Sequence, residues 1–492
     1  MVDRKCVELA GTEAVDRLAH GGNELTKTGL VIGRNRRLAH RLEASRTSFG
    51  VKAGPGTRRH AYPSRPIPES GIPVDRLCAD SVAGERAAVR ELQRQARVSV
   101  VQRTVSAPVA AVAGFASLAV LLTILVGALQ PDTPRHLQWL TGPAWLDGWI
   151  QYDSGWYYRI ATEGYAYTPG QQSSIAFFPT YPVLVRGVTS LLGDTQVSGM
   201  LLTAVAGAAS IALFALWASG RLTLSGTFTA VLLLLLYPYS FFLYGTMYAD
   251  AVFLLTVIGA FVLLERRHPW LAGLVGILAT AGRPVGIAVL VGLVVRTLEI
   301  RAGEASGSGQ RRLPFRALLD GWRYLRLTDA GVLLSGLGLA GWCTYLWLTY
   351  GDPFAFVAVE SAPGWDQGSG WRTWLKVSLL GQILHGHPQT AVACLLQGLI
   401  CLAAVLLLGR VWRRFGWGYL VYTLVVIGIP ILGSKDFMGC GRYLLAAFPV
   451  IAAGADLLVT TRYRWLRPVV FVVFAAGLVA GTALYATGFE VS

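Results

Sequence analysis

Charged side chains are sparse in this chain, and those that could do chemistry lie next to apolar stretches. Asp153, Arg159 and Glu163 fall in the aromatic segment QYDSGWYYRIATEGYAYTPGQQSSIAFFPTYP (151–182). Further charged or phenolic residues follow, namely Tyr248, Asp250, Arg283, Lys435 and Arg442. Cations beside a carboxylate suit group transfer from a phosphate, because the cations neutralise the leaving phosphate and the carboxylate takes a proton from the acceptor hydroxyl.

Each of these residues also has a purely structural interpretation. Asp153 precedes an expected helix and could be its N-cap, whereas Glu163, near the end of that helix, could be a solvated residue. Arg283 could snorkel to the interface and Arg442 could be an interfacial anchor. The aromatic run WYY (156–158) is typical of the belt at a membrane surface, and a second role is to stack on sugar rings.

The composition indicates a membrane protein built from helices. Of 492 residues, 53% are hydrophobic and 14% are charged, and the mean hydropathy is +0.49. A soluble chain of this length would carry about 25% charge. Apolar runs of about 20 residues recur without the alternation of barrel strands, which predicts an all-α polytopic membrane protein.

The positions of the basic residues predict the topology. Residues 1–106 are Arg-rich and dotted with Gly and Pro, as expected of a basic, mostly disordered cytoplasmic tail before a membrane domain at 107–492. We expect about eleven crossings, within a range of 9 to 12, near 107–130, 196–219, 224–247, 249–265, 270–283, 284–297, 329–350, 386–409, 415–434, 442–459 and 467–489. Keeping the basic loops inside gives a cytoplasmic N-terminus, a cytoplasmic linker at 298–328, and outer loops at 131–195 and 351–385.

Two segments could change the number of crossings. Residues 176–193 (AFFPTYPVLVRGVTSLLG) are apolar enough to cross, but counting them would invert every later basic loop. Residues 270–297 are long for one span and short for two. Because Pro284 follows Arg283 in the middle, we predict two short helices that meet at Arg283 near the outer face.

Several other classes of protein are disfavoured. The net charge of +15 follows from basic cytoplasmic loops, and no basic module with interleaved aromatic residues points to nucleic acid. The six cysteines form no CxxC pair, so neither a disulfide framework nor a zinc site is indicated. No ligand cluster argues for a divalent metal, whose involvement stays open, and no nucleotide-phosphate loop is present.

At this level of detail the sequence resembles a known family. YDSGWYYRIATEGY followed by AFFPTYP resembles the W-D-x-x-x-[FY]-x-x-I-A-x-x-G-Y … A-F-F-P-x-[FY]-P signature of the PIG-V mannosyltransferase family, which includes GPI mannosyltransferase II and belongs to the GT-C class. YPYSFFLYGTMYADAVFLL, LERRHPWLAGLVGILATAGRPVG, GDPFAFV and CGRYLLAAFP are similar to its later motifs. The similarity spans about 140–455 and does not reach residues 1–106.

The resemblance implies a GT-C-like bundle whose large first outer loop, 131–195, is catalytic and carries short interfacial helices. Asp153 matches the acidic position of that loop and becomes the candidate general base. Asp250 matches the family's Glu/Asp, Arg283 its Ala-Thr-motif Arg and Arg442 its late Arg-Tyr. The chain departs from the pattern at three positions, with Tyr152 in place of Trp and with Gly282 and Pro284 around the motif Arg.

The predicted function is a membrane glycosyltransferase that moves a hexose, most simply mannose, from a polyprenyl phosphate to an extracytoplasmic hydroxyl by an inverting displacement. Asp153 would be catalytic, and Arg283, Arg442 and Lys435 would bind the phosphate. The supporting residues would be Tyr152, Trp156, Arg159, Glu163, Tyr248 and Asp250. The expected partners are the lipid-linked donor, a glycan, glycolipid or protein acceptor, and lipids of the plasma membrane, with no other cofactor required. The alternatives are a transporter or flippase for a lipid-linked sugar and a non-catalytic envelope-assembly protein.

Overall fold

The structure is a computed structural model that describes residues 106–130, 140–306, 313–367, 370–385, 388–489 and 491. The chain divides into two units, Met1–Gln102 and Arg103–Ser492. All the described residues belong to the second unit. The tail predicted over 1–106 therefore lies outside the described residues, except for its last position, and the separation of tail and membrane domain stays a prediction.

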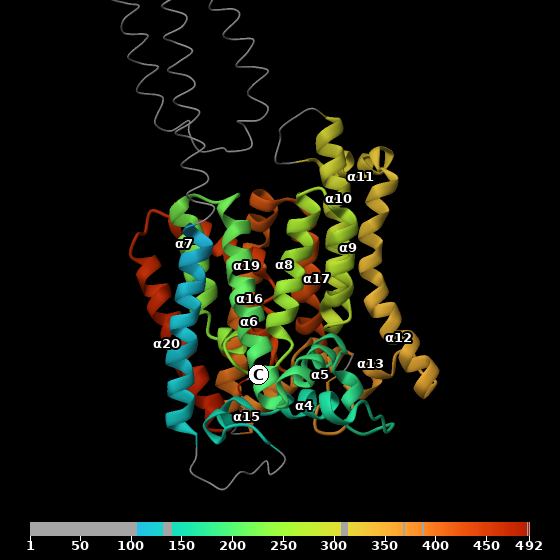
Figure 1. Cartoon of the computed structure of the whole chain (residues 1–492). Coiled ribbons are helices and arrows are strands. Elements are labelled where there is room, and N and C mark those ends of the chain that lie inside the picture. The colour runs from blue at the N-terminus through green and yellow to red at the C-terminus, as the bar shows by residue number, and fades with distance from the viewer. Residues whose placement is uncertain are drawn as a thin grey trace, which may run out of the picture. The chain divides into compact units, whose positions relative to one another are not determined.

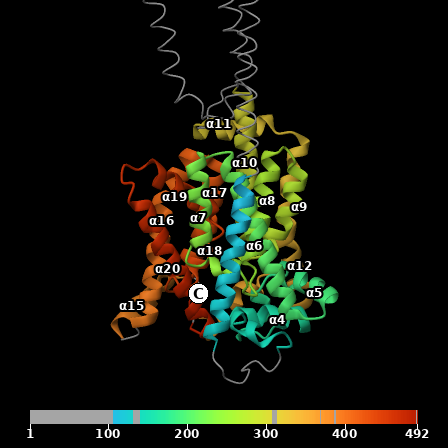
Figure 2. The same cartoon turned by 60° about the vertical axis from the view of Figure 1, so that its left-hand side comes forward.

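Within the described ranges every regular element is a helix, and the longer helices stand side by side as a bundle (Figures 1 and 2). Five helices in this part of the chain are long and apolar enough to cross a membrane. They are Ser106–Leu129, α6 (Thr195–Ser219), η6 with α12 (Leu327–Gly336 and Leu337–Tyr350), α16 (Pro388–Phe415) and α20 (Leu466–Ala486). The membrane-protein class thus has support from the helices themselves.

Shorter helices occupy the remaining predicted spans. They are α7 (Leu224–Leu236), α8 (Asp250–Glu265), α9 (Pro269–Thr280), α10 (Ile287–Ala305), α17 (Trp417–Gly433) and α19 (Phe448–Thr460). An α-helix rises about 1.5 Å per residue, and a hydrocarbon core is about 30 Å thick. Length and composition therefore do not establish these six as crossings, and the predicted number of about eleven is not confirmed.

Two predicted spans run past the ends of their helices, whereas α10 and α16 continue beyond the predicted ends at 297 and 409, to Ala305 and Phe415. The predicted span 224–247 is helical only to Leu236, because Pro238 cannot continue a helix, and a separate turn, η3 (Ser240–Leu243), follows it. The predicted span 442–459 begins at Phe448, with Pro449 in the first turn. The residues before it form a separate short helix, α18 (Cys440–Tyr443).

The two short helices predicted around Arg283 are present. α9 ends at Thr280, a 3-10 turn η4 (Pro284–Gly286) follows, and α10 begins at Ile287. Arg283 is extended, with φ −158° and ψ 153°, as the residue before a proline prefers. Gly286 permits the tight return, because a Cβ on it would lie 2.4 Å from the carbonyl oxygen of Ala279.

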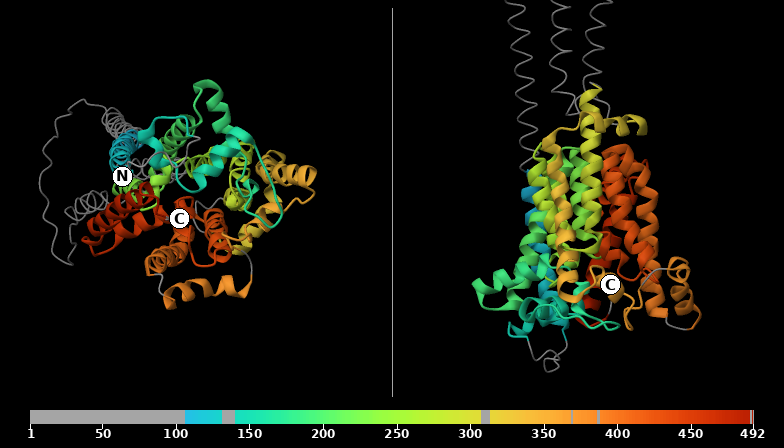
Figure 3. Two further views of the ribbon diagram at one scale, coloured as in Figure 1. Left: turned by 90° about the horizontal axis from the view of Figure 1, so that it is seen from below. Right: turned by 90° about the vertical axis from the view of Figure 1, so that its right-hand side faces the viewer.

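Short helices gather at one end of the bundle, the lower end in Figure 1 and the face toward the viewer in the left panel of Figure 3. They are η1 (Ala144–Trp149), α4 (Asp153–Glu163), η2 (Ser174–Ala176), α5 (Thr180–Leu192), α13 (Ala355–Val359), α14 (Trp371–Trp374) and α15 (Val377–Leu384). α5 covers most of the ambiguous segment 176–193 and lies with α4 at this end, as expected of a loop helix. At the opposite end are α11 (Phe315–Asp320) and η5 (Gly321–Tyr324).

Candidate active site

Two ion pairs, one buried and one partly exposed, meet at the end of the bundle that carries the short helices. The Arg442 guanidinium donates from Nη1 to Oδ2 of Asp153 at 2.9 Å, and Arg283 pairs with Asp250. Arg442 Nε also lies 4.0 Å from Oδ2 of Asp250, which links the two pairs. We call these four residues the acid–arginine cluster. They come from the starts of α4 and α8, the η4 turn and α18, so distant segments build one site.

Asp153 is not an N-cap. It is the first residue of α4, and Tyr152, with φ 51°, holds the cap position without a capping side-chain bond. The Asp153 carboxylate turns instead toward Arg442, while its backbone N–H donates to the Tyr248 hydroxyl at 3.1 Å. The left-handed backbone at Tyr152 is uncommon for a residue with a side chain. The Tyr152 hydroxyl donates to the carbonyl of Gly488, which ties this turn to the end of the chain.

The two arginines are neither snorkelling nor interfacial anchors. The exposed fractions of the Arg283 and Arg442 side chains are 6% and 10%. The Arg283 guanidinium lies over the Tyr443 ring, 4.3 Å from its centroid. Gly441 lets α18 approach closely, since a Cβ there would lie 2.3 Å from the Tyr239 ring. A buried arginine needs anionic partners, and here they are the two aspartates.

Two tyrosines hold the backbone around Asp153. Tyr248 accepts from the Asp153 N–H, and the Arg442 guanidinium lies 5.0 Å from its ring centroid. Tyr485 belongs to α20, and its hydroxyl lies 3.2 Å from Ser154 Oγ and donates to the Gln151 carbonyl at 3.1 Å. Tyr248 is a predicted supporting residue, and Tyr443 is the tyrosine of the late Arg-Tyr motif. No sequence motif singles out Tyr485, because its part in the site exists only in the packed bundle.

The aromatic residues of α4 do not form a surface belt. Tyr157 and Tyr158 are buried, and burial raises the pKa of the Tyr157 phenol above its usual range. Trp156 is half-buried, with its ring centroid 5.8 Å from that of Phe177 and 5.9 Å from that of Trp365. These rings pack the first loop against the loop that follows α12. The belt interpretation is therefore wrong for the two tyrosines.

Three of the charged residues predicted for the site lie outside the acid–arginine cluster. Arg159 and Glu163 pair with each other at 3.3 Å on the surface of α4, with side chains 60% and 64% exposed. Lys435 Nζ donates to the Trp365 carbonyl at 3.0 Å and lies 3.5 Å from Oδ2 of Asp366. Lys435 therefore binds the loop that carries Trp365 and Asp366, whereas Arg283 and Arg442 pair with the aspartates of the cluster.

The acid–arginine cluster combines access with unsatisfied polar atoms. The Asp153 side chain is 28% exposed, whereas that of Asp250 is 2% exposed. Asp250 Oδ2 and Arg442 Nε are buried and lack a hydrogen-bond partner in the structure. Such atoms are rare in folded proteins, and each calls for a structural or functional explanation. Among the described residues no group of three His, Cys, Asp or Glu side chains could hold a metal ion.

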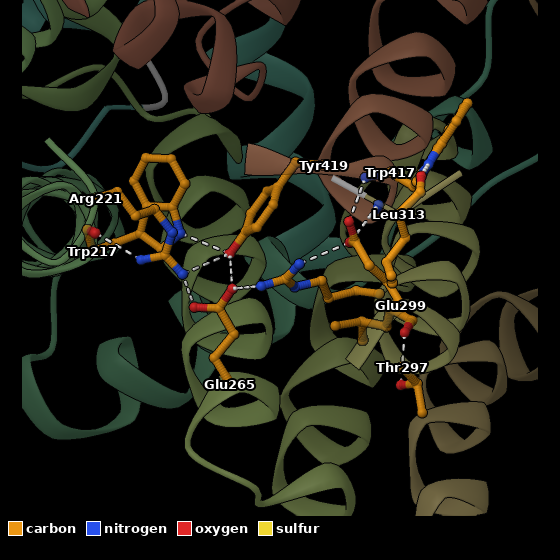
Figure 4. Close-up of polar contacts among 11 residues, drawn as sticks. Trp217, Arg221, Glu265, Thr297, Glu299, Leu313, Trp417 and Tyr419 are labelled. Carbon is orange, nitrogen blue, oxygen red and sulfur yellow. Dashed lines mark hydrogen bonds and ion pairs between the residues drawn. The ribbon is translucent and has the colours of Figure 1, made fainter. Parts of the chain in front are cut away.

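A second polar cluster lies at the other end of α8 (Figure 4). Its centre is Glu265, which pairs with Arg221 and Arg296 and accepts from the Tyr419 hydroxyl at 2.8 Å. Arg296 also donates to Glu299 at 2.7 Å. We call this group the Glu265 cluster.

Glu299 extends the Glu265 cluster to the start of α17. Its carboxylate accepts from the backbone N–H groups of Trp417 at 2.9 Å and Gly418 at 3.3 Å. These are among the N–H groups that a helix leaves unpaired at its N-terminus, where negative charge is also favourable. Glu299 therefore caps α17, and no sequence motif predicts this contact between distant segments.

Comparisons with known proteins give only remote likenesses. Neither a protein-family model nor a curated protein matches the sequence. Among solved structures, the Archaeoglobus fulgidus oligosaccharyltransferase in its apo form matches with 12% identity and a TM-score of 0.39, over 76% of this chain and 55% of that chain. The same enzyme tethered to an acceptor peptide matches with 14% identity and a TM-score of 0.36, over 76% and 54%. The chain thus spans about half the length of these structures, and the resemblance to the PIG-V family stays a prediction.

Proposed function

We propose that this chain is a membrane glycosyltransferase that moves a hexose, most simply mannose, from a polyprenyl-phosphate donor to an acceptor hydroxyl. The observation that carries the proposal is the acid–arginine cluster, in which a partly exposed carboxylate contacts a buried arginine at 2.9 Å. The cluster lies at one end of the bundle, where a lipid phosphate would meet a water-borne acceptor. Together with the sequence motifs, this arrangement favours transfer chemistry at a membrane surface.

The proposed reaction uses the cluster as follows. Arg442 and Arg283 hold the donor phosphate and neutralise the charge that develops as the bond between the sugar and the phosphate breaks. The acceptor oxygen attacks the anomeric carbon from the opposite face, which inverts its configuration. Asp153 takes the proton that the acceptor hydroxyl loses. Lys435 would add a further cation if it left its carbonyl partner for the phosphate.

The alternative function is transport of a lipid-linked sugar, which would involve the same lipid-linked molecule as glycosyl transfer. Transporters place ionisable groups near the bilayer midplane, between helices that are broken there. In this chain both polar clusters lie at the ends of α8, with Asp250 at its first residue and Glu265 at its last. That placement favours chemistry at a surface over passage through the bundle.

The test is sugar transfer by purified protein in liposomes without any ion gradient. The donor is radiolabelled polyprenyl-phosphate mannose and the acceptor is a cell-envelope extract. We expect the wild type to transfer label and Asp153→Asn to be slower by about 100-fold or more, because the variant lacks the base. Equal transfer by the two proteins would contradict the role of Asp153. No transfer by the wild type with any polyprenyl-linked sugar would contradict the proposed function.

Asp352→Asn is the matched control for this experiment. Asp352 is also a carboxylate next to the site-bearing loops, and its Oδ1 accepts from the Phe354 N–H at 2.8 Å. Asparagine keeps that acceptor oxygen, so the local turn survives while one negative charge is removed. We expect transfer by this variant to stay within about twofold of the wild type, as for a surface substitution.

A further inference from the structure

The helix that carries Arg442 is too short to hold itself in place. α18 spans four residues, Cys440–Tyr443, and follows Gly439, whose φ of 80° lies in the left-handed region. Forming one helical turn fixes several backbone dihedral angles in return for a single hydrogen bond, so a helix of this length depends on its surroundings. The position of Arg442 is therefore set by the elements that contact α18.

Gly441, the residue before Arg442, is bonded by side chains from two other parts of the bundle. Its N–H donates to Oε1 of Gln397 in α16 at 2.9 Å, and its carbonyl accepts from the hydroxyl of Tyr237, at the end of α7, at 2.8 Å. The next backbone bond runs past Gly441, since the Leu445 N–H donates to the Arg442 carbonyl at 3.1 Å. The two side chains thus fix the backbone directly before the arginine.

Gln397 is a polar residue in an apolar helix. Its exposed fraction is 0%, and α16 is long and apolar enough to cross a membrane. Burying an amide is costly unless it is hydrogen-bonded, and polar side chains inside a membrane are most often functional. The other end of the side chain donates to Met438 Sδ at 3.4 Å, and a thioether is a weak acceptor. The bond to Gly441 is therefore the stronger reason for a glutamine at this position.

Aromatic rings enclose the Arg442 side chain. Its guanidinium lies 5.4 Å from the ring centroid of Phe242 and 5.0 Å from that of Tyr248, and it reaches Asp153 at 2.9 Å. Protein interiors are closely packed and transmit small displacements. A shift of the backbone at Gly441 would therefore move the guanidinium away from Asp153, because the surrounding rings leave the side chain little freedom to compensate.

We propose that Gln397 and Tyr237 are positioning residues for Arg442. They hold the backbone at Gly441 so that the guanidinium meets Asp153 and the place where the donor phosphate would bind. The inference rests on the proposed glycosyl transfer for the phosphate, whereas the contact with Asp153 is part of the structure. Both residues act through Arg442. No sequence motif singles out Gln397, because its bond to Gly441 joins segments that are distant in the chain.

The first measurement is sugar transfer per folded molecule in the liposome assay. Gln397→Leu removes the acceptor of the Gly441 N–H, and we expect transfer to be about tenfold slower, because small misplacements of a group that binds the substrate are costly. Gln397→Glu keeps an acceptor oxygen at the same distance along the side chain and should recover part of the rate. In an Arg442→Gln background, Gln397→Leu should cause no further loss, because the residue that it positions has been removed.

Tyr237→Phe and Tyr244→Phe form a matched pair of variants. Each removes a buried hydroxyl that donates to a backbone carbonyl at 2.8 Å, that of Gly441 in the first case and that of Leu235 in the second. The two variants should lower the melting temperature by similar amounts, because the lost bonds are alike. We expect Tyr237→Phe to slow transfer by about fivefold, whereas Tyr244→Phe should stay within about twofold of the wild type.

The second measurement is thermal unfolding in detergent, which does not depend on activity. Gln397 reaches Asp153 through Gly441 and Arg442. Gln397→Leu should therefore lower the melting temperature less in an Asp153→Asn background than in the wild type, because the weakened contact between Asp153 and Arg442 is part of its cost. Tyr244→Phe, the control, should lower the melting temperature equally in both backgrounds.

The outcomes distinguish positioning from general support of the fold. Wild-type transfer in Gln397→Leu, or the same relative loss with and without Arg442, would overturn the positioning role and leave the glycosyltransferase intact. Equal losses of melting temperature for Gln397→Leu in the wild-type and Asp153→Asn backgrounds would also overturn it. Absence of wild-type transfer from any polyprenyl-phosphate sugar would overturn the proposed function, and the unfolding comparison would then decide the positioning role by itself.

Discussion

The two ends of α8 carry clusters of the same residue types, and the clusters differ in how completely their polar atoms are hydrogen-bonded. At its last residue, Glu265 has two arginine partners and the Tyr419 hydroxyl. At its first residue, Asp250 pairs with Arg283, and its second oxygen is buried without a hydrogen bond. Among the described residues, only Arg296 Nε lacks a hydrogen bond at the Glu265 end, whereas Asp250 Oδ2 and Arg442 Nε, 4.0 Å apart, both lack one at the other end.

This difference distinguishes charged residues that hold helices together from charged residues that could take part in a reaction. The Glu265 cluster joins helices, and its carboxylates also meet a tyrosine and the start of α17. The acid–arginine cluster includes a carboxylate, Asp153, that is 28% exposed, so an acceptor from water could reach it. A buried ion pair is by itself weak evidence of function or of stability. Access together with unsatisfied polar atoms is the feature that favours the first cluster as the site.

The largest effect is expected when Arg442, the cation that both aspartates of the acid–arginine cluster share, is replaced. Arg442→Gln should reduce sugar transfer by about 100-fold or more, because the phosphate loses a buried positive charge. Arg442→Lys keeps the charge but not the planar fork, and should fall between this variant and the wild type. Turnover measured per folded protein, with folding checked by size exclusion in detergent, gives the answer. Wild-type turnover in Arg442→Gln would place the phosphate elsewhere.

The corresponding change at the other end should affect stability and spare activity. Glu265→Gln leaves Arg221 and Arg296 with one carboxylate fewer at partly buried positions, which should destabilise the fold by about 3 kcal/mol. Thermal unfolding in detergent measures the loss. Transfer per folded molecule should stay within about twofold of the wild type. A specific loss of transfer with unchanged unfolding would show that the Glu265 cluster is functional.

The smallest effect is expected at an exposed pair near the Glu265 end. Asp320 and Arg323 lie 3.8 Å apart with side chains 58% and 64% exposed. Exposed ion pairs contribute little, so Asp320→Asn should change the free energy of unfolding by about 0.5 kcal/mol or less. The same unfolding assay provides the measurement. A loss as large as that of Glu265→Gln would mean that burial is not what distinguishes the two pairs.

The local parts of the fold could be read from the sequence. Proline positions predicted the break after Arg283, and apolar runs located the longer helices. A first-loop helix was expected directly after Asp153, and α4 begins one residue earlier, at Asp153 itself. Bounds failed where an apolar run continued past a helix end, as after Leu236. Hydropathy measures burial in lipid or protein and does not report whether the backbone is still helical.

The candidate site was predictable as a set of residues and not as an arrangement. Asp153, Asp250, Arg283 and Arg442 were selected from the sequence and lie together. Lys435 was selected with them but meets a carbonyl of another loop. The sequence offered structural roles for Asp153, as a cap, and for both arginines, as interface residues. Those alternatives failed because each depends on what lies beside the residue in space.

The sequence by itself determined the class of protein, the local breaks and the residue types available for chemistry. These follow from composition and from the periodicity of neighbouring residues, which constrain the backbone locally. Only the tertiary structure decided that Asp153 meets Arg442, 289 residues away, and that Glu299 caps a helix from more than a hundred residues away. Such pairs depend on which helix faces pack together, and that choice belongs to the whole bundle.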